Sequence, residues 1–239
     1  MSLFEQVARW FLDGRHWSGD FGIPHGITEH LLMSGASSLA AALIALPIGI
    51  LLGHIGKGGI LAINISNIGR AIPSFALLVI AVQLVGIGAL PAFVALVALA
   101  IPPMVTNSYI GMGEVDLDVR EAARGMGMRE RAILLGVELP IALPFIMAGI
   151  RTSAVNVVAT ATLAALVGWG GLGRFIIDGF SQRDDIQIIA GALIVALLSI
   201  AVEFTFTGLQ WLAVPRGLRT RQTKGEEARA VPTSELSAA

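Results

Sequence analysis

The sequence predicts an all-α integral membrane protein of about five transmembrane helices, with its N-terminus outside and its C-terminus in the cytoplasm. Its 239 residues are 55% hydrophobic and only 14% charged, and the mean hydropathy is +0.78. Soluble domains carry roughly 25% charged residues. The charges are also unevenly spread, and they leave uncharged stretches as long as the ~20 residues that a transmembrane helix needs. Lysine and arginine gather in the connections on one side, which sets the orientation.

The N-terminal segment, residues 1–28, is predicted to lie at the extracytoplasmic membrane surface. It lacks the basic start, apolar run and small-residue cleavage site of a signal peptide. Its charged residues are instead interspersed with aromatic side chains, which favour the headgroup level of a bilayer. These aromatic residues are Phe4, Trp10, Phe11, Trp17 and Phe21.

The transmembrane domain, residues 29–215, is predicted to hold five spans. Four of them cover residues 31–55, about 91–109, 140–167 and 186–214. The second span ends near Val85, because the following glycine- and proline-containing segment has the composition of a turn. Its start is left open by Arg70 and Pro73, either of which fits inside or before the span. Residues 216–239 are polar and are predicted to form a disordered cytoplasmic tail.

Basic residues determine the orientation of these spans. With the N-terminus outside, 11 Lys and Arg fall on the cytoplasmic side and four on the external side, and Arg151 alone lies inside a span. Positive charge in cytoplasmic connections is the rule for multi-pass proteins. The connection between the third and fourth spans, residues 111–140, is therefore expected in the cytoplasm.

A spaced motif occupies this connection, which we call loop 111–140. It reads Glu121-Ala-Ala, three residues, Gly127, nine residues, and Val137-Glu-Leu-Pro140. Residues 118–126 and 129–139 are expected to form two short helices, the second closed by Pro140. Gly127 between them can take the left-handed conformation that ends a helix. Read without reference to any family, the loop is a protruding helical hairpin.

The motif resembles the cytoplasmic coupling loop, or EAA loop, of permease subunits in binding-protein-dependent ABC importers. It departs from that pattern only at Val137, where an isoleucine is usual, and this is a volume-conserving change. Four further segments are similar to permeases of the osmoprotectant branch, which import glycine betaine, choline, carnitine or related quaternary ammonium solutes. They are residues 64–74, 147–152, 159–168 and 170–173.

The resemblance implies a type I importer permease (MetI-like) fold in the bacterial plasma membrane and a set of partners. They are two cytoplasmic ABC ATPase subunits, a second permease that is a copy of this chain or a homologue, and an extracytoplasmic solute-binding protein. It also implies roles in the loop. Glu121 is the candidate polar contact to the ATPase, Ala122 and Ala123 allow close approach or act as helix formers, and Gly127 sets the angle between the two helices. Leu139 with Pro140 directs the chain into the fourth span.

No cofactor is expected to bind this chain, because it contains no Gly-x-x-x-x-Gly-Lys-Ser/Thr motif. ATP and Mg would be used by the partner ATPase, and the chain itself is not expected to be an enzyme. The net charge of −1 gives no reason to invoke nucleic acid. Two alternatives remain open, namely an importer permease for another small solute such as an amino acid and an ion-coupled secondary transporter that uses Glu203.

Arg151 and Glu203 are each the only charge in their spans, and they lie at matching depths from the cytoplasmic side. Because an unpaired charge at that depth costs at least ~2.5 kcal/mol, we expect the two to pair. A static pair, a gate that opens during transport, and separate partners such as backbone carbonyls or Thr205 remain alternatives. The external segment after the fourth span is expected to dock the binding protein. Its candidate docking residues are Trp169, Arg174, Asp178, Arg183, Asp184 and Asp185.

Overall fold

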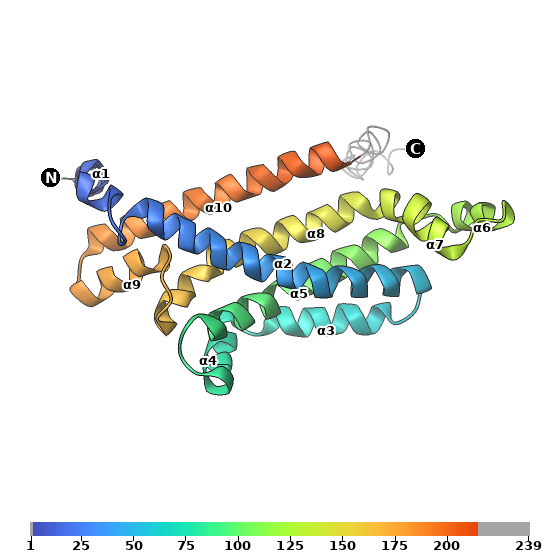
Figure 1. Ribbon diagram of the computed structural model, residues 1–239, viewed down its shortest axis with the longest axis horizontal. Helices are drawn as coiled ribbons and strands as arrows, with labels where there is room; N and C mark the ends of the chain where they lie inside the picture. The colour runs from blue at the N-terminus through green and yellow to red at the C-terminus, as the bar shows by residue number, and fades with distance from the viewer. Residues whose placement is uncertain (1, 215–239) are drawn as a thin grey trace, which may run out of the picture.

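The computed structural model describes residues 2–214, and this part of the chain consists of helices joined by short turns, with no strand (Figure 1). The predicted tail, residues 216–239, lies outside the described residues. The helices before loop 111–140 are α1 (Leu3–Leu12), η1 (Gly14–Trp17), α2 (Ile23–Ile55), α3 (Gly59–Ala71), α4 (Ser74–Val85) and α5 (Ala89–Gly113). Those that follow are α6 (Leu117–Gly125), α7 (Glu130–Ile133), η2 (Leu134–Glu138), α8 (Leu139–Thr160), η3 (Ala161–Val167), α9 (Gly173–Gln182) and α10 (Asp185–Ala213).

Four helical segments among the described residues are long and apolar enough to cross a membrane. They are α2, α5, the run 130–167 that contains α8, and α10, and they lie roughly along the long axis of the molecule (Figure 1). Helix α2 has 33 residues and is therefore ~50 Å long, well above the ~30 Å of a hydrocarbon core. It begins at Ile23, earlier than the predicted span.

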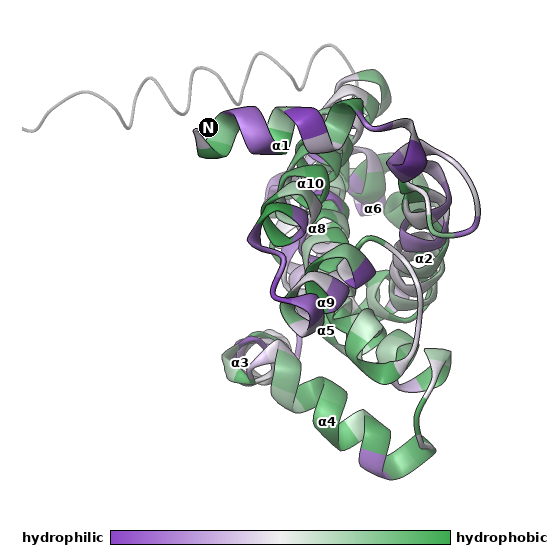
Figure 2. Ribbon diagram, turned by 90° about the vertical axis from the view of Figure 1, so that its left-hand side faces the viewer, coloured by the Kyte–Doolittle hydropathy of each residue, from purple (hydrophilic) through white to green (hydrophobic). Residues whose placement is uncertain are grey.

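The predicted second span is divided between α3 and α4. The break falls at Ile72 and Pro73, both of which have extended backbone angles. The proline explains the break, because its ring disfavours helical angles in the residue before it. Arg70 therefore lies in the last turn of α3, before the break. Helix α4 then projects sideways from the bundle (Figure 2) and exposes large apolar side chains such as Ile80 and Leu84.

Small residues allow the central helices to pack closely. Helix α5 lies between α2 and α8, and the largest buried cluster joins α2, α4, α5, α8 and η3. A Cβ on Gly53 of α2 would lie 2.3 Å from the Met112 side chain of α5, so only glycine fits there. Between α5 and α8, the Ser153 hydroxyl donates a hydrogen bond of 2.8 Å to the Ala100 carbonyl. Small residues and interhelical hydroxyls are the usual means by which membrane helices associate.

The prediction that Pro140 closes the second loop helix is wrong. Residues 130–167 form one continuous helical run, in which η2 is a π-helical turn. The Leu139 N–H bonds to the Leu134 carbonyl, five residues back. In a regular α-helix the Pro140 ring would clash with the carbonyl four residues earlier. The wider π-turn just before the proline relieves that clash, so the loop continues rigidly into α8.

Candidate functional site

Loop 111–140 lies at one end of the bundle, opposite the end that carries α1 and α9 (Figure 1). Its first helix, α6, is capped at both ends. The Asp116 carboxylate accepts a hydrogen bond of 2.9 Å from the Asp118 N–H. At the other end, Gly127 has φ +81°. The Gly127 N–H bonds to the Arg124 carbonyl, and the next N–H bonds to the Ala123 carbonyl. This is the Schellman arrangement, which requires a left-handed residue at the position of Gly127.

An exposed ion pair joins the two loop helices across this turn. The Arg124 guanidinium of α6 donates two hydrogen bonds, of 2.8 and 3.2 Å, to the Glu130 carboxylate of α7. These hydrogen bonds raise the pKa of Arg124 above its ordinary value. Both side chains are about half exposed, so the pair contributes little to stability and mainly orients α6 against α7.

A buried network anchors the loop to the membrane helices. Glu138, in the π-turn, is completely buried. One of its oxygens lies 2.5 Å from Nδ1 of His54 at the end of α2. The other lies 3.1 Å from Nε of Arg120 in α6, an ion pair without hydrogen-bond geometry. The same guanidinium donates to the Met112 carbonyl at the end of α5.

This network connects α6 with α2, α5 and the helix that continues into α8. A completely buried carboxylate is tolerated only when it is paired, and breaking such a pair costs about 3–5 kcal/mol. His54 is also largely buried, and its other ring nitrogen lies 3.8 Å from the Glu130 carboxylate. The network therefore joins α6 to the ends of three membrane helices through charged contacts.

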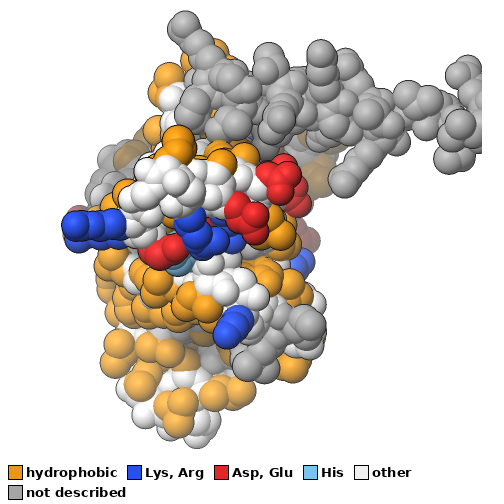
Figure 3. All heavy atoms as spheres, turned by 90° about the vertical axis from the view of Figure 1, so that its right-hand side faces the viewer, with side chains coloured by type: hydrophobic (Ala, Val, Ile, Leu, Met, Phe, Trp, Pro, Cys, Tyr) orange, Lys and Arg blue, Asp and Glu red, His pale blue; other side chains and the backbone are white. Residues whose placement is uncertain are grey.

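The outer surface of the loop carries the groups that a partner would meet. Glu121 and Ala122 are exposed, whereas Ala123 is buried against the rest of the loop. Within residues 2–214 the Glu121 carboxylate makes no hydrogen bond or ion pair. Leu117 and Met126 are 68% and 76% exposed, which leaves an apolar surface beside the acid. Figure 3 shows this end of the molecule, where charged and apolar side chains lie side by side.

The last three motif residues lie at the base of the loop. Val137, Leu139 and Pro140 are partly buried where the loop runs into α8. Reasoning from the sequence missed Arg120, His54 and Glu138, although His54 and Glu138 stand beside predicted span ends and Arg120 lies within loop 111–140. The available signal for the network was Glu138, because a carboxylate at the start of an apolar span needs a partner.

The structure places Arg151 of α8 beside Glu203 of α10. Nε of Arg151 lies 3.4 Å from a Glu203 oxygen, and the guanidinium also donates a hydrogen bond of 3.2 Å to Thr207 Oγ1. The two charged side chains are 30% and 44% exposed in the single chain. The pair thus sits on the flank between α8 and α10 rather than in the main apolar core.

The predicted docking residues do not form one surface. Trp169 is partly buried against the main core cluster, so it does not face outward with the others. Arg174 and Asp178 pair at 3.4 Å on α9. Asp184 caps α10 and accepts hydrogen bonds of 3.0 Å from the N–H groups of Ile186 and Gln187. Arg183, with φ 57°, and Asp185 are exposed beside it.

Comparison with known proteins places the chain in a family. Residues 45–217 match the family described as binding-protein-dependent transport system inner membrane component. The carnitine transport permease protein OpuCB of Listeria monocytogenes is 37% identical over 83% of this chain and 91% of that protein. The choline transport system permease protein OpuBB of Bacillus subtilis is 36% identical over 80% of this chain and 88% of its own length.

Two more comparisons agree. The osmoprotectant import permease protein OsmW of Salmonella typhimurium is 34% identical over 80% of this chain and 91% of that relative. An inward-facing structure of the MetNI methionine ABC transporter covers 80% of this chain and 95% of the matched chain, with 26% identity and a TM-score of 0.69. The all-helical fold and the multi-pass membrane character agree with these matches. The chain belongs to the family of inner membrane permease components of binding-protein-dependent transport systems.

Proposed function

We propose that this chain forms the membrane pathway of an ABC importer for quaternary ammonium osmoprotectants such as choline, glycine betaine and carnitine. A separate ATPase drives transport, and a binding protein delivers the solute. The observation that supports the importer role most is the Arg120–Glu138–His54 network, because it gives an external motor at α6 a charged linkage to α2, α5 and α8. The names of the curated relatives supply the solute class.

The mechanism follows from the shape of the loop. Closure of the ATPase upon ATP binding moves α6, through contacts at Glu121 and the neighbouring apolar side chains. The Schellman turn, the Arg124–Glu130 pair and the buried Glu138 keep the loop from deforming independently of the spans. The bundle then changes between inward-open and outward-open forms, a two-state element whose equilibrium the nucleotide biases.

A direct test reconstitutes the complex. The chain would be tagged and purified from its own host with the subunits that co-purify, and placed in proteoliposomes with ATP inside. We expect an ATPase to co-purify and labelled choline, glycine betaine or carnitine to accumulate when the binding protein is supplied outside. ATP hydrolysis should rise when that protein is loaded.

The outcomes separate the alternatives. Because the chain also shares its fold with a methionine transporter, amino acids are the second candidate solutes. Accumulation of methionine or another amino acid, with no quaternary ammonium uptake, would assign the chain to that class. Uptake that follows an ion gradient without ATP would show that the importer assignment is wrong.

A further inference from the structure

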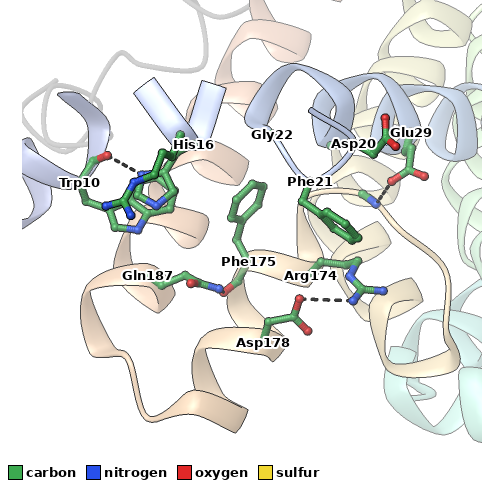
Figure 4. A pocket seen from close by; sticks show the side chains of 13 residues that line it. Trp10, His16, Asp20, Phe21, Gly22, Glu29, Arg174, Phe175, Asp178 and Gln187 are labelled. Carbon is green, nitrogen blue, oxygen red and sulfur yellow. Dashed lines mark hydrogen bonds and ion pairs between the residues drawn. The ribbon is translucent and has the colours of Figure 1, made fainter. Parts of the chain in front are cut away.

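The end of the molecule opposite loop 111–140 contains a pocket of about 280 Å³. It is formed by α1, η1, the segment between η1 and α2, the first turns of α2, the glycine-rich turn before α9, α9 itself and the start of α10. Three aromatic rings line it, those of Trp10, Phe21 and Phe175. Figure 4 shows these side chains converging from segments far apart in the sequence.

Hydrogen bonds hold the wall of the pocket in place. The Glu29 carboxylate of α2 accepts a hydrogen bond of 2.7 Å from the Gly171 N–H. The preceding residue, Gly170, passes so close that a Cβ there would lie 1.9 Å from a Glu29 oxygen. On the opposite side, the Gln187 amide donates a hydrogen bond of 3.2 Å to the Phe175 carbonyl and orients the start of α9. The pocket is therefore preformed within the single chain.

Negative charge predominates in the pocket. Asp20, Glu29 and Asp178 contribute carboxylates, against the guanidinium groups of Arg15 and Arg174. Arg15 already makes three side-chain hydrogen bonds to Asp13 outside the pocket, which lowers the pKa of Asp13 to about 2 and offsets the Arg15 charge. Arg174 is paired with Asp178. Two carboxylates, those of Asp20 and Glu29, are thus left without an arginine partner. Glu29 lies 3.4 Å from Nε2 of His25, whereas Asp20 has no hydrogen bond or ion pair within the described residues.

The rings complement this charge. Trp10 is 9% exposed. Its ring stacks on His16, with 3.9 Å between the ring centroids, and lies edge-on to Phe175, with 5.8 Å between the ring centroids. Trp10 therefore supports the Phe175 ring. Phe21 is 82% exposed and stacks on no other ring among residues 2–214. Carboxylates next to free ring faces suit a cation that carries methyl groups instead of hydrogen-bond donors, because such a cation is held by charge and by the ring quadrupole.

We infer that this pocket is an extracytoplasmic site for a quaternary ammonium headgroup on the permease itself. The inference rests on the proposed function for its choice of cation, and it adds a site that receives the solute before the membrane is crossed. Asp20 and Glu29 supply the negative field, Phe21 and Phe175 contact the methyl groups, and Arg174 stands at the side where a solute carboxylate would lie.

The test uses the full chain alone, in nanodiscs made of phosphatidylglycerol and phosphatidylethanolamine so that no lipid carries a choline group. Saturation-transfer NMR would observe the methyl protons of choline. The comparison ligand is 3,3-dimethylbutan-1-ol, in which carbon replaces the charged nitrogen. We expect transfer to choline at millimolar concentration and little to the neutral alcohol.

Two exposed pocket variants then locate the binding. Phe21→Leu and Asp20→Asn should each weaken choline binding about 3- to 30-fold, the range expected for loss of one cation contact. Phe180→Leu is the matched control, because Phe180 is an exposed ring on α9 outside the pocket. Equal transfer to the alcohol, no transfer at all, or unchanged binding in both pocket variants would overturn the inference. Uptake by the reconstituted complex tests the proposed function separately, so uptake without choline binding to the chain would overturn the site alone.

Discussion

Glu138 joins loop 111–140 to the membrane helices. It is completely buried, and its two oxygens contact groups from two different helices, one of them 84 residues away in the sequence. A carboxylate in this position orients two cations or donors at once, which an apolar residue of the same size cannot do. The arrangement determines where α6 stands relative to α2.

The first prediction concerns this carboxylate. Glu138→Leu leaves Arg120 buried without its partner, so we expect a loss of about 3–5 kcal/mol in stability and loss of uptake. The loss of stability is measured by heating the purified chain and recording the fraction that stays monodisperse. Glu114→Gln, a change of an exposed acid at the start of the loop, is the control and should unfold like the wild type. Equal stability of Glu138→Leu and the control would show that the network does not hold the loop.

The second prediction concerns Arg151 and Glu203, which lie 3.4 Å apart. Removing one partner leaves the other charge unpaired at membrane depth. Arg151→Met and Glu203→Gln should therefore each lower the folded yield, and the double variant should recover part of it. A double-mutant cycle on folded yield measures this coupling. Strictly additive losses would mean that the two side chains do not stabilise each other.

The third prediction separates Asp184 from Asp185 in the docking segment. Asp184 caps α10, so Asp184→Lys should destabilise the chain by about 1 kcal/mol. Asp185 is exposed, and Asp185→Lys should leave thermal stability unchanged. If this segment docks the binding protein, Asp185→Lys should slow uptake at subsaturating binding protein, because exposed charges act mainly on the rate of encounter. Unchanged uptake over a titration of binding protein would remove Asp185 from the docking surface.

Helix α6 forms the outer part of loop 111–140, and its C-terminal end is determined by backbone conformation. Gly127 has φ +81°, and a Cβ added there would meet no atom within 4 Å. Gly125 is equally open but lies inside the helix with an ordinary φ. The two positions therefore differ in backbone strain and in little else.

The fourth prediction uses this pair. Gly127→Ala should strain the turn by about 1–2 kcal/mol and reduce the coupling of ATP hydrolysis to uptake. Gly125→Ala should do neither, since alanine is the better helix former. The measurement is the ratio of solute transported to ATP hydrolysed, at equal membrane abundance. Identical ratios for the two variants would show that the inter-helix angle does not limit coupling.

At the scale of the whole molecule, the two ends of the bundle are chemically distinct. One end carries the charged loop 111–140, and the other carries α1 and α9 (Figure 1). The aromatic pocket lies at this second end. The chain has no cysteine, so single cysteines can report the side of the membrane on which each end lies. Exposed positions are available at both ends, at Phe21 and at Leu117.

The fifth prediction is the labelling pattern of single cysteines at these two positions. In intact cells, a membrane-impermeant maleimide should label Phe21→Cys but not Leu117→Cys. Both should be labelled after permeabilisation, and the wild-type chain should not react in either condition. Labelling of Leu117→Cys from outside would reverse the orientation, and with it the assignment of loop 111–140 to the ATPase side.

The sequence by itself determined the membrane class, the approximate spans and the left-handed turn at Gly127. These follow from hydropathy, charge counts and glycine chemistry, which are local or additive along the chain. Only the tertiary structure decided that Glu138 meets His54 and Arg120, that Asp184 is used as a helix cap, and that α7 runs through a π-turn into α8. Such outcomes depend on which helix faces which, and that is set by the close packing of small residues between α2, α5 and α8 rather than by any single segment.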